Sequence, residues 1–124
     1  MLRLLVFALI FFGGAAQAHD SRPLYVEVIE SGVGDVSVKW MAPASISAAD
    51  APVVALGPPC VVVVGADAGA LHGQSRYRCS GGVKDATLSI NYPLYNPSIS
   101  TLARIRFEDG QIRTAVLEPS QTSW

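Results

Sequence analysis

Two histidines are the residues of this sequence best suited to hold a metal ion. His19 and His72 are the only histidines in the chain. A chain cut directly before His19 would offer an α-amine and an imidazole from one residue. The pKa of such an α-amine is about 8, so a tightly bound Cu(II) ion readily displaces its proton. With His72 as second imidazole and Asp20 or Asp67 supplying oxygen, these residues predict a copper or nickel site. The alternative is a frayed terminus at His19 and an exposed loop residue at His72.

The first 18 residues carry the features of a signal peptide that is cut before His19. Arg3 provides the positive charge, residues 4–12 are apolar, and residues 13–18 are mostly small. Ala16 and Ala18 stand at the two positions that signal peptidase recognises. The apolar run is about half of the roughly 20 residues that a membrane-spanning helix needs. We therefore expect an exported, periplasmic or secreted protein with His19 as its first residue.

The two cysteines agree with an oxidising compartment. Cys60 and Cys79 are the only cysteines in the chain, and no metal-binding or redox spacing surrounds them. A disulfide between them is the expected outcome in an exported protein. Closing a loop of this length stabilises a protein by about 3 kcal/mol on the chain-entropy model.

Other patterns exclude several classes of function. Gly32 and Gly34 lie in an expected hairpin turn rather than ahead of a helix, so they do not form a dinucleotide-binding loop. No pattern places a serine nucleophile beside either histidine, and we expect no enzyme activity. The chain has 9 basic and 10 acidic residues without a basic cluster. This balance argues against nucleic acid as a partner.

Short alternating apolar runs, separated by Gly, Pro, Asp and Ser, predict the elements that must position these residues. The expected strands cover residues 24–28, 36–40, 52–56, 60–64, 75–79, 87–92, 103–107 and 112–117. Seven or eight strands at this spacing predict an all-β, antiparallel, two-sheet sandwich of immunoglobulin-like kind with one disulfide. The run over residues 60–64 is apolar on both faces, which is typical of a central or covered strand. His72 falls in a small-residue loop over 65–73. The expected domain spans 19–118, and 119–124 is expected to be an exposed tail.

Three stretches resemble the extracytoplasmic N-terminal region of the HupE/UreJ family of membrane proteins. They are residues 18–28 with the following 38–40, residues 77–82, and the ending 102–107, 109–110 and 116–120. The resemblance implies a periplasmic β-sandwich in a family associated with nickel or cobalt uptake for hydrogenase or urease. In that family several membrane helices with His and Asp residues follow this domain. Because no apolar run of that length follows His19 in this sequence, only the periplasmic domain is carried over.

Two hypotheses follow for the function. The first is a non-catalytic periplasmic domain that binds or docks to a membrane protein partner, linked to nickel or cobalt uptake. The second is a stand-alone copper or nickel carrier that uses His19 and His72. The opening histidine is similar to that of small periplasmic copper carriers of the CopC type, which are also exported β-sandwiches.

Overall fold

A computed structural model describes residues 22–124, which form eight strands and one short 3-10 helix, Ala48–Asp50. The strands are β1 (Leu24–Gly32), β2 (Asp35–Met41), β3 (Val53–Leu56), β4 (Cys60–Val64), β5 (His72–Cys79), β6 (Leu88–Asn91), β7 (Thr101–Arg106) and β8 (Ile112–Leu117). Each expected strand is present, with ends that differ by a few residues. The predicted signal peptide, His19 and Asp20 lie outside the described residues.

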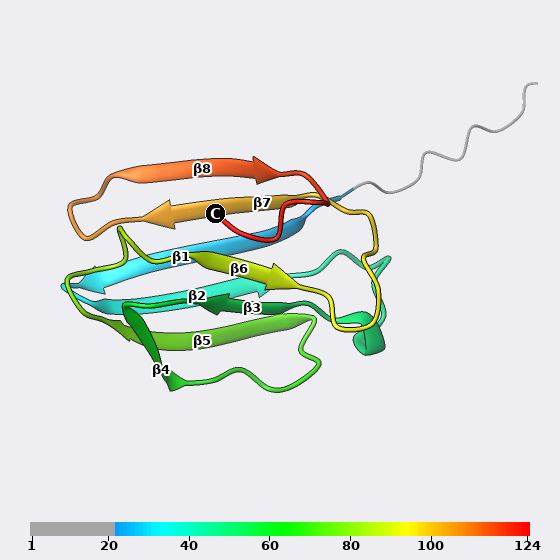
Figure 1. The fold of residues 1–124 in the computed structure, drawn as a ribbon, viewed down its shortest axis with the longest axis horizontal. Helices are drawn as coiled ribbons and strands as arrows, with labels where there is room; N and C mark the ends of the chain where they lie inside the picture. Colours follow the sequence, from blue (N-terminus) through cyan, green and yellow to red (C-terminus); the bar gives the residue numbers. More distant parts are fainter. Residues whose placement is uncertain (1–21) are drawn as a thin grey trace, which may run out of the picture.

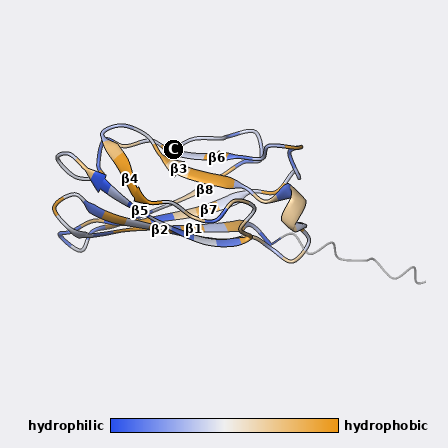
Figure 2. Ribbon diagram, turned by 90° about the horizontal axis from the view of Figure 1, so that it is seen from below, coloured by the Kyte–Doolittle hydropathy of each residue, from blue (hydrophilic) through white to orange (hydrophobic). Residues whose placement is uncertain are grey.

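The strands form two sheets that pack face to face (Figures 1 and 2). The large sheet has the order β4-β5-β2-β1-β7-β8, and the small sheet pairs β3 with β6. The predicted all-β two-sheet sandwich with one disulfide is confirmed. All strand pairs are antiparallel except β1 and β7, which run parallel. The chain crosses to the small sheet before β7, and parallel neighbours require a crossover of this kind.

Alternating side chains of the central strands build the core. Leu24, Val26 and Val28 of β1 are fully buried, as is Val38 of β2. Trp40, at the end of β2, is 6% exposed and joins the same cluster. These residues face the small sheet, so the opposite face of the large sheet is left to solvent. The inward and outward faces predicted for β1 and β2 are confirmed.

Strand β4 differs from the prediction of a central or covered strand. It is an edge strand of the large sheet, and its four valines, Val61 to Val64, are 51% to 68% exposed. In Figure 2 it is a hydrophobic strand at the rim of the sandwich. The physical reason is the width of the small sheet, which is too narrow to cover the large sheet as far as β4. An apolar run shows that a strand avoids charge, but not where it lies in the sheet.

The last residues, expected as an exposed tail, extend the small sheet. The backbone N–H and C=O of Leu88 both bond to Trp124, at 2.8 and 2.9 Å, and Ile90 N–H bonds to Thr122 O at 2.8 Å. The indole of Trp124 packs against the core. Since these bonds lie on the side of β6 away from β3, the free edge of the small sheet is β3. Among residues 22–124, no helix is long and apolar enough to cross a membrane.

Candidate functional site

A groove opens where the two sheets part between β3 and β4. One wall is formed by Val53 and Ala55 of β3, and the other by Val62 of β4. Trp40 and Tyr77 line the floor. The loop over residues 65–69 closes one end, and the cavity measures about 380 Å³. Its lining is mostly apolar, so the groove suits an apolar guest rather than an ion.

A small buried polar residue, Ser75, interrupts this apolar lining. Ser75 of β5 lies between Gly73 and Tyr77 on the inward face and is 3% exposed. Its Oγ is fully buried beside the groove and has no hydrogen-bond partner in the part of the chain that the structure describes. Leaving a buried hydroxyl unpaired costs about 1–3 kcal/mol.

The indole of Trp40 forms the inner end of the groove and is held by two features. Its Nε1–H donates to the carbonyl of Ala70, at 3.1 Å. Its ring packs directly on the backbone of Gly73, its partner across β2 and β5. A Cβ at Gly73 would lie 2.6 Å from Cη2 of the ring, so glycine is required there. The floor of the groove is therefore rigidly placed.

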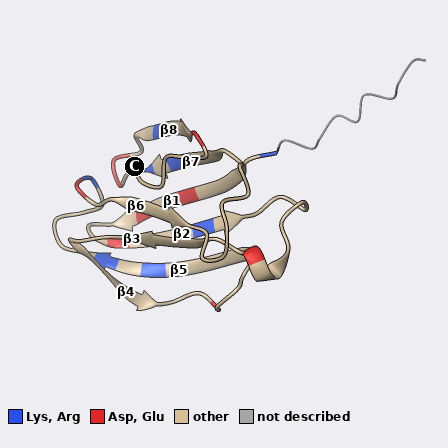
Figure 3. Ribbon diagram, turned by 45° about the vertical axis from the view of Figure 1, so that its right-hand side comes forward, with Lys and Arg blue, Asp and Glu red and all other residues tan. Residues whose placement is uncertain are grey.

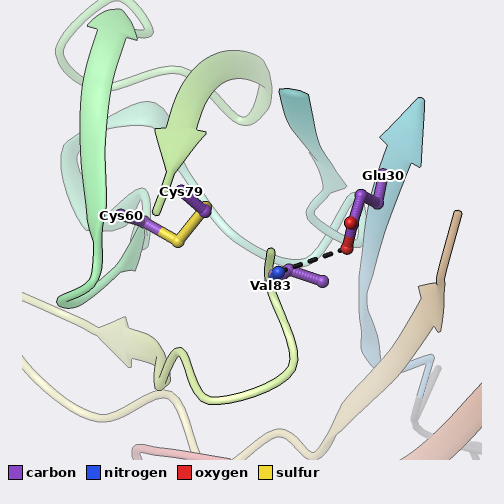
Figure 4. Close-up of a disulfide and its surroundings, with 4 residues drawn as sticks. All are labelled: Glu30, Cys60, Cys79 and Val83. Atoms are coloured by element: carbon purple, nitrogen blue, oxygen red, sulfur yellow. Dashed lines mark hydrogen bonds between the residues drawn. A yellow bond between two sulfur atoms is a disulfide. The ribbon is translucent and has the colours of Figure 1, made fainter. Parts of the chain in front are cut away.

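The disulfide fixes one end of β4 to the sheet. Cys60 and Cys79 are direct cross-strand partners and are joined, as predicted from their number and compartment (Figure 4). Next to it, the Glu30 carboxylate accepts a 3.2 Å hydrogen bond from Val83 N–H, which ties the turn after β5 to β1. At the other end, pairing between β4 and β5 shifts register between Val62 and Val64, as in a β-bulge. Strand β4 is thus anchored at Cys60 and bends away toward Val64.

Charge distinguishes the edge strand β4 from its neighbour β5. Arg76 and Arg78 project from the outer face of β5, and Arg78 forms a 3.1 Å ion pair with Asp35 (Figure 3). Strand β4 carries no charged residue. Charged or proline residues commonly protect exposed edge strands from pairing with other chains. Strand β4 contains neither kind of residue, and only the irregular pairing between Val62 and Val64 interrupts its regular edge.

The predicted metal ligands are only partly located by the structure. His72 is exposed and begins β5, rather than lying in the loop expected over 65–73. It projects from the outer face, opposite Met41. Within residues 22–124, no three His, Cys, Asp or Glu side chains come together as a metal site. The predicted combination with His19 and Asp20 involves residues beyond that range and stays a prediction.

Sequence reasoning missed Ser75 and Met41. The alternation over residues 75–79 already places Ser75 on the same face as Cys79, so a polar side chain facing the core was a visible signal. Met41 follows the buried Trp40 and therefore faces outward, but its neighbour on β5 depends on strand register. That register joins residues 31 positions apart and has no local signature.

Tyr92, beyond β6, is a second buried hydroxyl without a hydrogen-bond partner among the described residues. Burial raises its pKa from 10.0 to about 12. The folded state therefore holds this proton more tightly than the unfolded state. Stability from this group is complete below about pH 10 and is lost as the pH rises toward 12.

We expect Tyr92→Phe to flatten the loss of stability between pH 10 and 12. Urea denaturation of both proteins at pH 8, 10 and 11 measures this, with the gap in favour of the variant widening as the pH rises. The control is Tyr25→Phe, which removes a tyrosine hydroxyl from the outward face of β1. Parallel curves for Tyr92→Phe and the unmodified protein would contradict the prediction.

No family model, curated protein or solved structure matches the chain. Function is therefore inferred from three features of the molecule itself: the groove, the neutral edge of β4, and the outer face that carries His72.

Proposed function

We propose that this chain is a non-catalytic, exported β-sandwich domain that docks an extended segment of a membrane protein partner at β4 and the adjoining groove. The observation that carries the proposal is the exposure of the four β4 valines on a neutral sheet edge. Such an edge presents unpaired backbone N–H and C=O groups. An added strand would satisfy them, which is the common mode of peptide recognition by sheet edges.

The groove supplies side-chain selectivity for such a segment. Alternate side chains of a strand paired with β4 would point to the same side as Val62, toward Trp40 and Tyr77. The segment would be apolar at these positions, in keeping with the mostly apolar lining of the groove. Because β4 lacks charge, we expect binding that changes little with ionic strength.

The signal peptide and the family resemblance support a membrane protein as the partner. An exported domain meets the periplasmic side of the inner membrane. The HupE/UreJ resemblance suggests a partner that takes part in nickel or cobalt uptake, for which this domain would serve as the periplasmic docking module.

Photocrosslinking tests the docking edge. A photoreactive residue at Val61, which is 68% exposed on β4, should give an adduct with a membrane protein in intact host cells. Val116 is a matched control, since it is 61% exposed on β8 at the opposite edge of the same sheet. Val63→Lys should reduce the Val61 adduct at least tenfold, because a lysine on the edge blocks strand addition. Val116→Lys should leave the adduct unchanged.

Three outcomes would contradict docking of a membrane partner. Equal adducts from Val61 and Val116 would show that capture is not specific to β4. An adduct between two copies of this chain would assign the edge to self-association. If the protein is folded and exported but gives no adduct at Val61, the docking proposal is contradicted.

A second candidate function, carriage of copper or nickel, is supported by a separate observation. His72 is exposed on the outer face of the large sheet, away from the groove, with its side chain available to solvent. This surface does not overlap the β4 edge, so the two functions can be tested independently.

A further inference from the structure

The hydrogen bonds around the disulfide reveal which way the backbone groups of β4 point. In an antiparallel pair, residues whose N–H and C=O bond to the partner strand alternate with residues whose groups point away from it. The N–H of Cys79 donates to the carbonyl of Gly34, at 2.8 Å, so the backbone groups of Cys79 point toward β2. Cys60 is the cross-strand partner of Cys79. It therefore turns its own backbone groups away from β5.

The same alternation gives the direction of the next two residues of β4. Val61 is opposite Arg78, and Val62 is opposite Tyr77. Val61, one position after Cys60, directs its N–H and C=O toward Arg78. Val62, two positions after Cys60, directs both groups away from β5, where β4 has no neighbour in the large sheet (Figure 1). Val62 thus presents one donor and one acceptor at the free edge.

Both ends of β4 limit the length of edge that a guest strand can use. At its start, the N–H of Cys60 donates to the carbonyl of Gly57, at 3.0 Å, so it is already engaged. At its end, the pairing with β5 shifts register between Val62 and Val64, and such a bulge breaks the regular alternation. A guest strand must therefore form its paired hydrogen bonds at Val62.

The side chain of Val62 lies on the side of the groove. It forms one wall, Val53 lies on the opposite wall, and Trp40 and Tyr77 are on the floor. Side chains that are directly opposite in neighbouring strands share a face, with Cβ atoms about 4.5–5.5 Å apart. The guest residue opposite Val62 therefore projects over the groove. Its two neighbours in the guest project from the other face of the sheet.

The lining of the groove selects the side chain of this guest residue. Trp40 and Tyr77 offer aromatic rings, and the walls offer the side chains of Val53, Ala55 and Val62. A charged side chain would lose its hydration there without gaining a partner on the floor. Among the described lining residues, only Asp67 is charged, and it belongs to the loop that closes one end. A side chain as small as that of alanine would leave the groove unfilled and lose packing contacts.

We propose that β4 binds its partner segment in one register, with leucine, methionine or phenylalanine opposite Val62 and hydrogen bonds to the N–H and C=O of Val62. The inference rests on the proposed docking at β4 and defines the segment that docks there. A slip of one residue would turn the large apolar side chain away from the groove, which disfavours the other registers.

Amide hydrogen exchange in the free, processed protein tests the direction of the backbone groups. The N–H of Val61 should exchange at least tenfold more slowly than that of Val62, because the first bonds to Arg78 and the second faces solvent. This measurement requires no partner. Equal rates, or slower exchange at Val62, would overturn the inference.

The variant Val62→Pro removes the outward N–H. Proline is tolerated on an edge strand where the missing N–H faced solvent, so the variant should fold, as judged by urea denaturation. It should reduce the Val61 photoadduct at least tenfold, because a guest strand loses one of its paired hydrogen bonds. Val62→Ala is the matched control, since it shortens the side chain but keeps the N–H, and it should cause a smaller loss. If the proline variant fails to fold, the exchange rates of Val61 and Val62 still decide the direction of the N–H.

Mass spectrometry of the Val61 adduct tests the guest side chain. In the host membrane protein, a leucine, methionine or phenylalanine should lie next to the captured residue. Charged residues or glycines on both sides of the captured residue would overturn the register. An adduct of unchanged yield in folded Val62→Pro would likewise contradict the register while docking at β4 stands. Absence of any Val61 adduct would contradict docking itself.

Discussion

Removal of the disulfide is expected to lower the free energy of unfolding by about 3 kcal/mol. Cys60 and Cys79 are 19 positions apart and join β4 to β5 at buried positions. The crosslink restricts the unfolded chain, and a domain of this size has only about 5–15 kcal/mol of stability in total. The loss should be largest for β4, because β5 is its only neighbour in the large sheet. Urea denaturation of the processed protein with and without reductant measures the effect.

Reduction of the unmodified protein and replacement of both cysteines by alanine test different parts of this effect. Reduction keeps both sulfur atoms in the core, so its cost reports on the crosslink alone. The double alanine variant also loses buried volume and should be less stable than the reduced protein. Amide exchange should show faster exchange of β4 than of β1 in both. Equal unfolding midpoints for the oxidised and reduced proteins would contradict the prediction.

The sequence predicts the fold well wherever one face of a strand is buried and the other is wet. In β1 and β2 the alternation of Leu24, Val26 and Val28 with polar residues identifies the core face directly. Asp109 and Gly110 mark the hairpin between β7 and β8, and the positive φ of Gly110, 85°, is the conformation that such a turn requires. These signals are local, which is why sequence alone reveals them.

The candidate sites depend on long-range pairing and could not be predicted in the same way. The exposure of Val61 to Val64 follows from the narrow small sheet, in which β3 pairs with β6 across 32 to 38 positions of the sequence. The proximity of Met41 and His72 likewise follows from the register of β2 against β5. A shift of one residue would turn Met41 into the core and Trp40 to solvent. The imidazole of His72 suggested a metal ligand from the sequence alone, but only the strand register shows that Met41 lies beside it.

Replacement of Trp40 by alanine is expected to cost about 3–5 kcal/mol, the range for truncation of a buried aromatic side chain. Trp40 packs on Gly73, closes the inner end of the groove, and donates the hydrogen bond to Ala70. Loss of the indole would leave a cavity that opens into the groove. Gly73 has no side chain and Ala70 has only a methyl group, so neither residue can fill it. Trp40→Phe keeps an aromatic ring but removes the N–H donor. It should lower the free energy of unfolding by about 1 kcal/mol for the lost hydrogen bond to Ala70, and by a further amount for the smaller ring.

Met41→Ala is the matched control for this substitution, since it changes the adjacent residue on the exposed face. Because Met41 is 56% exposed, its effect on stability should stay within about 0.5 kcal/mol. Trp124 remains in every variant, so its fluorescence follows unfolding in each of them. A cost below 1 kcal/mol for Trp40→Ala would mean that the indole does not support the floor of the groove. A large cost that is accompanied by loss of the Val61 adduct, while Met41→Ala keeps both stability and adduct, would connect the rigidity of this floor to docking at β4.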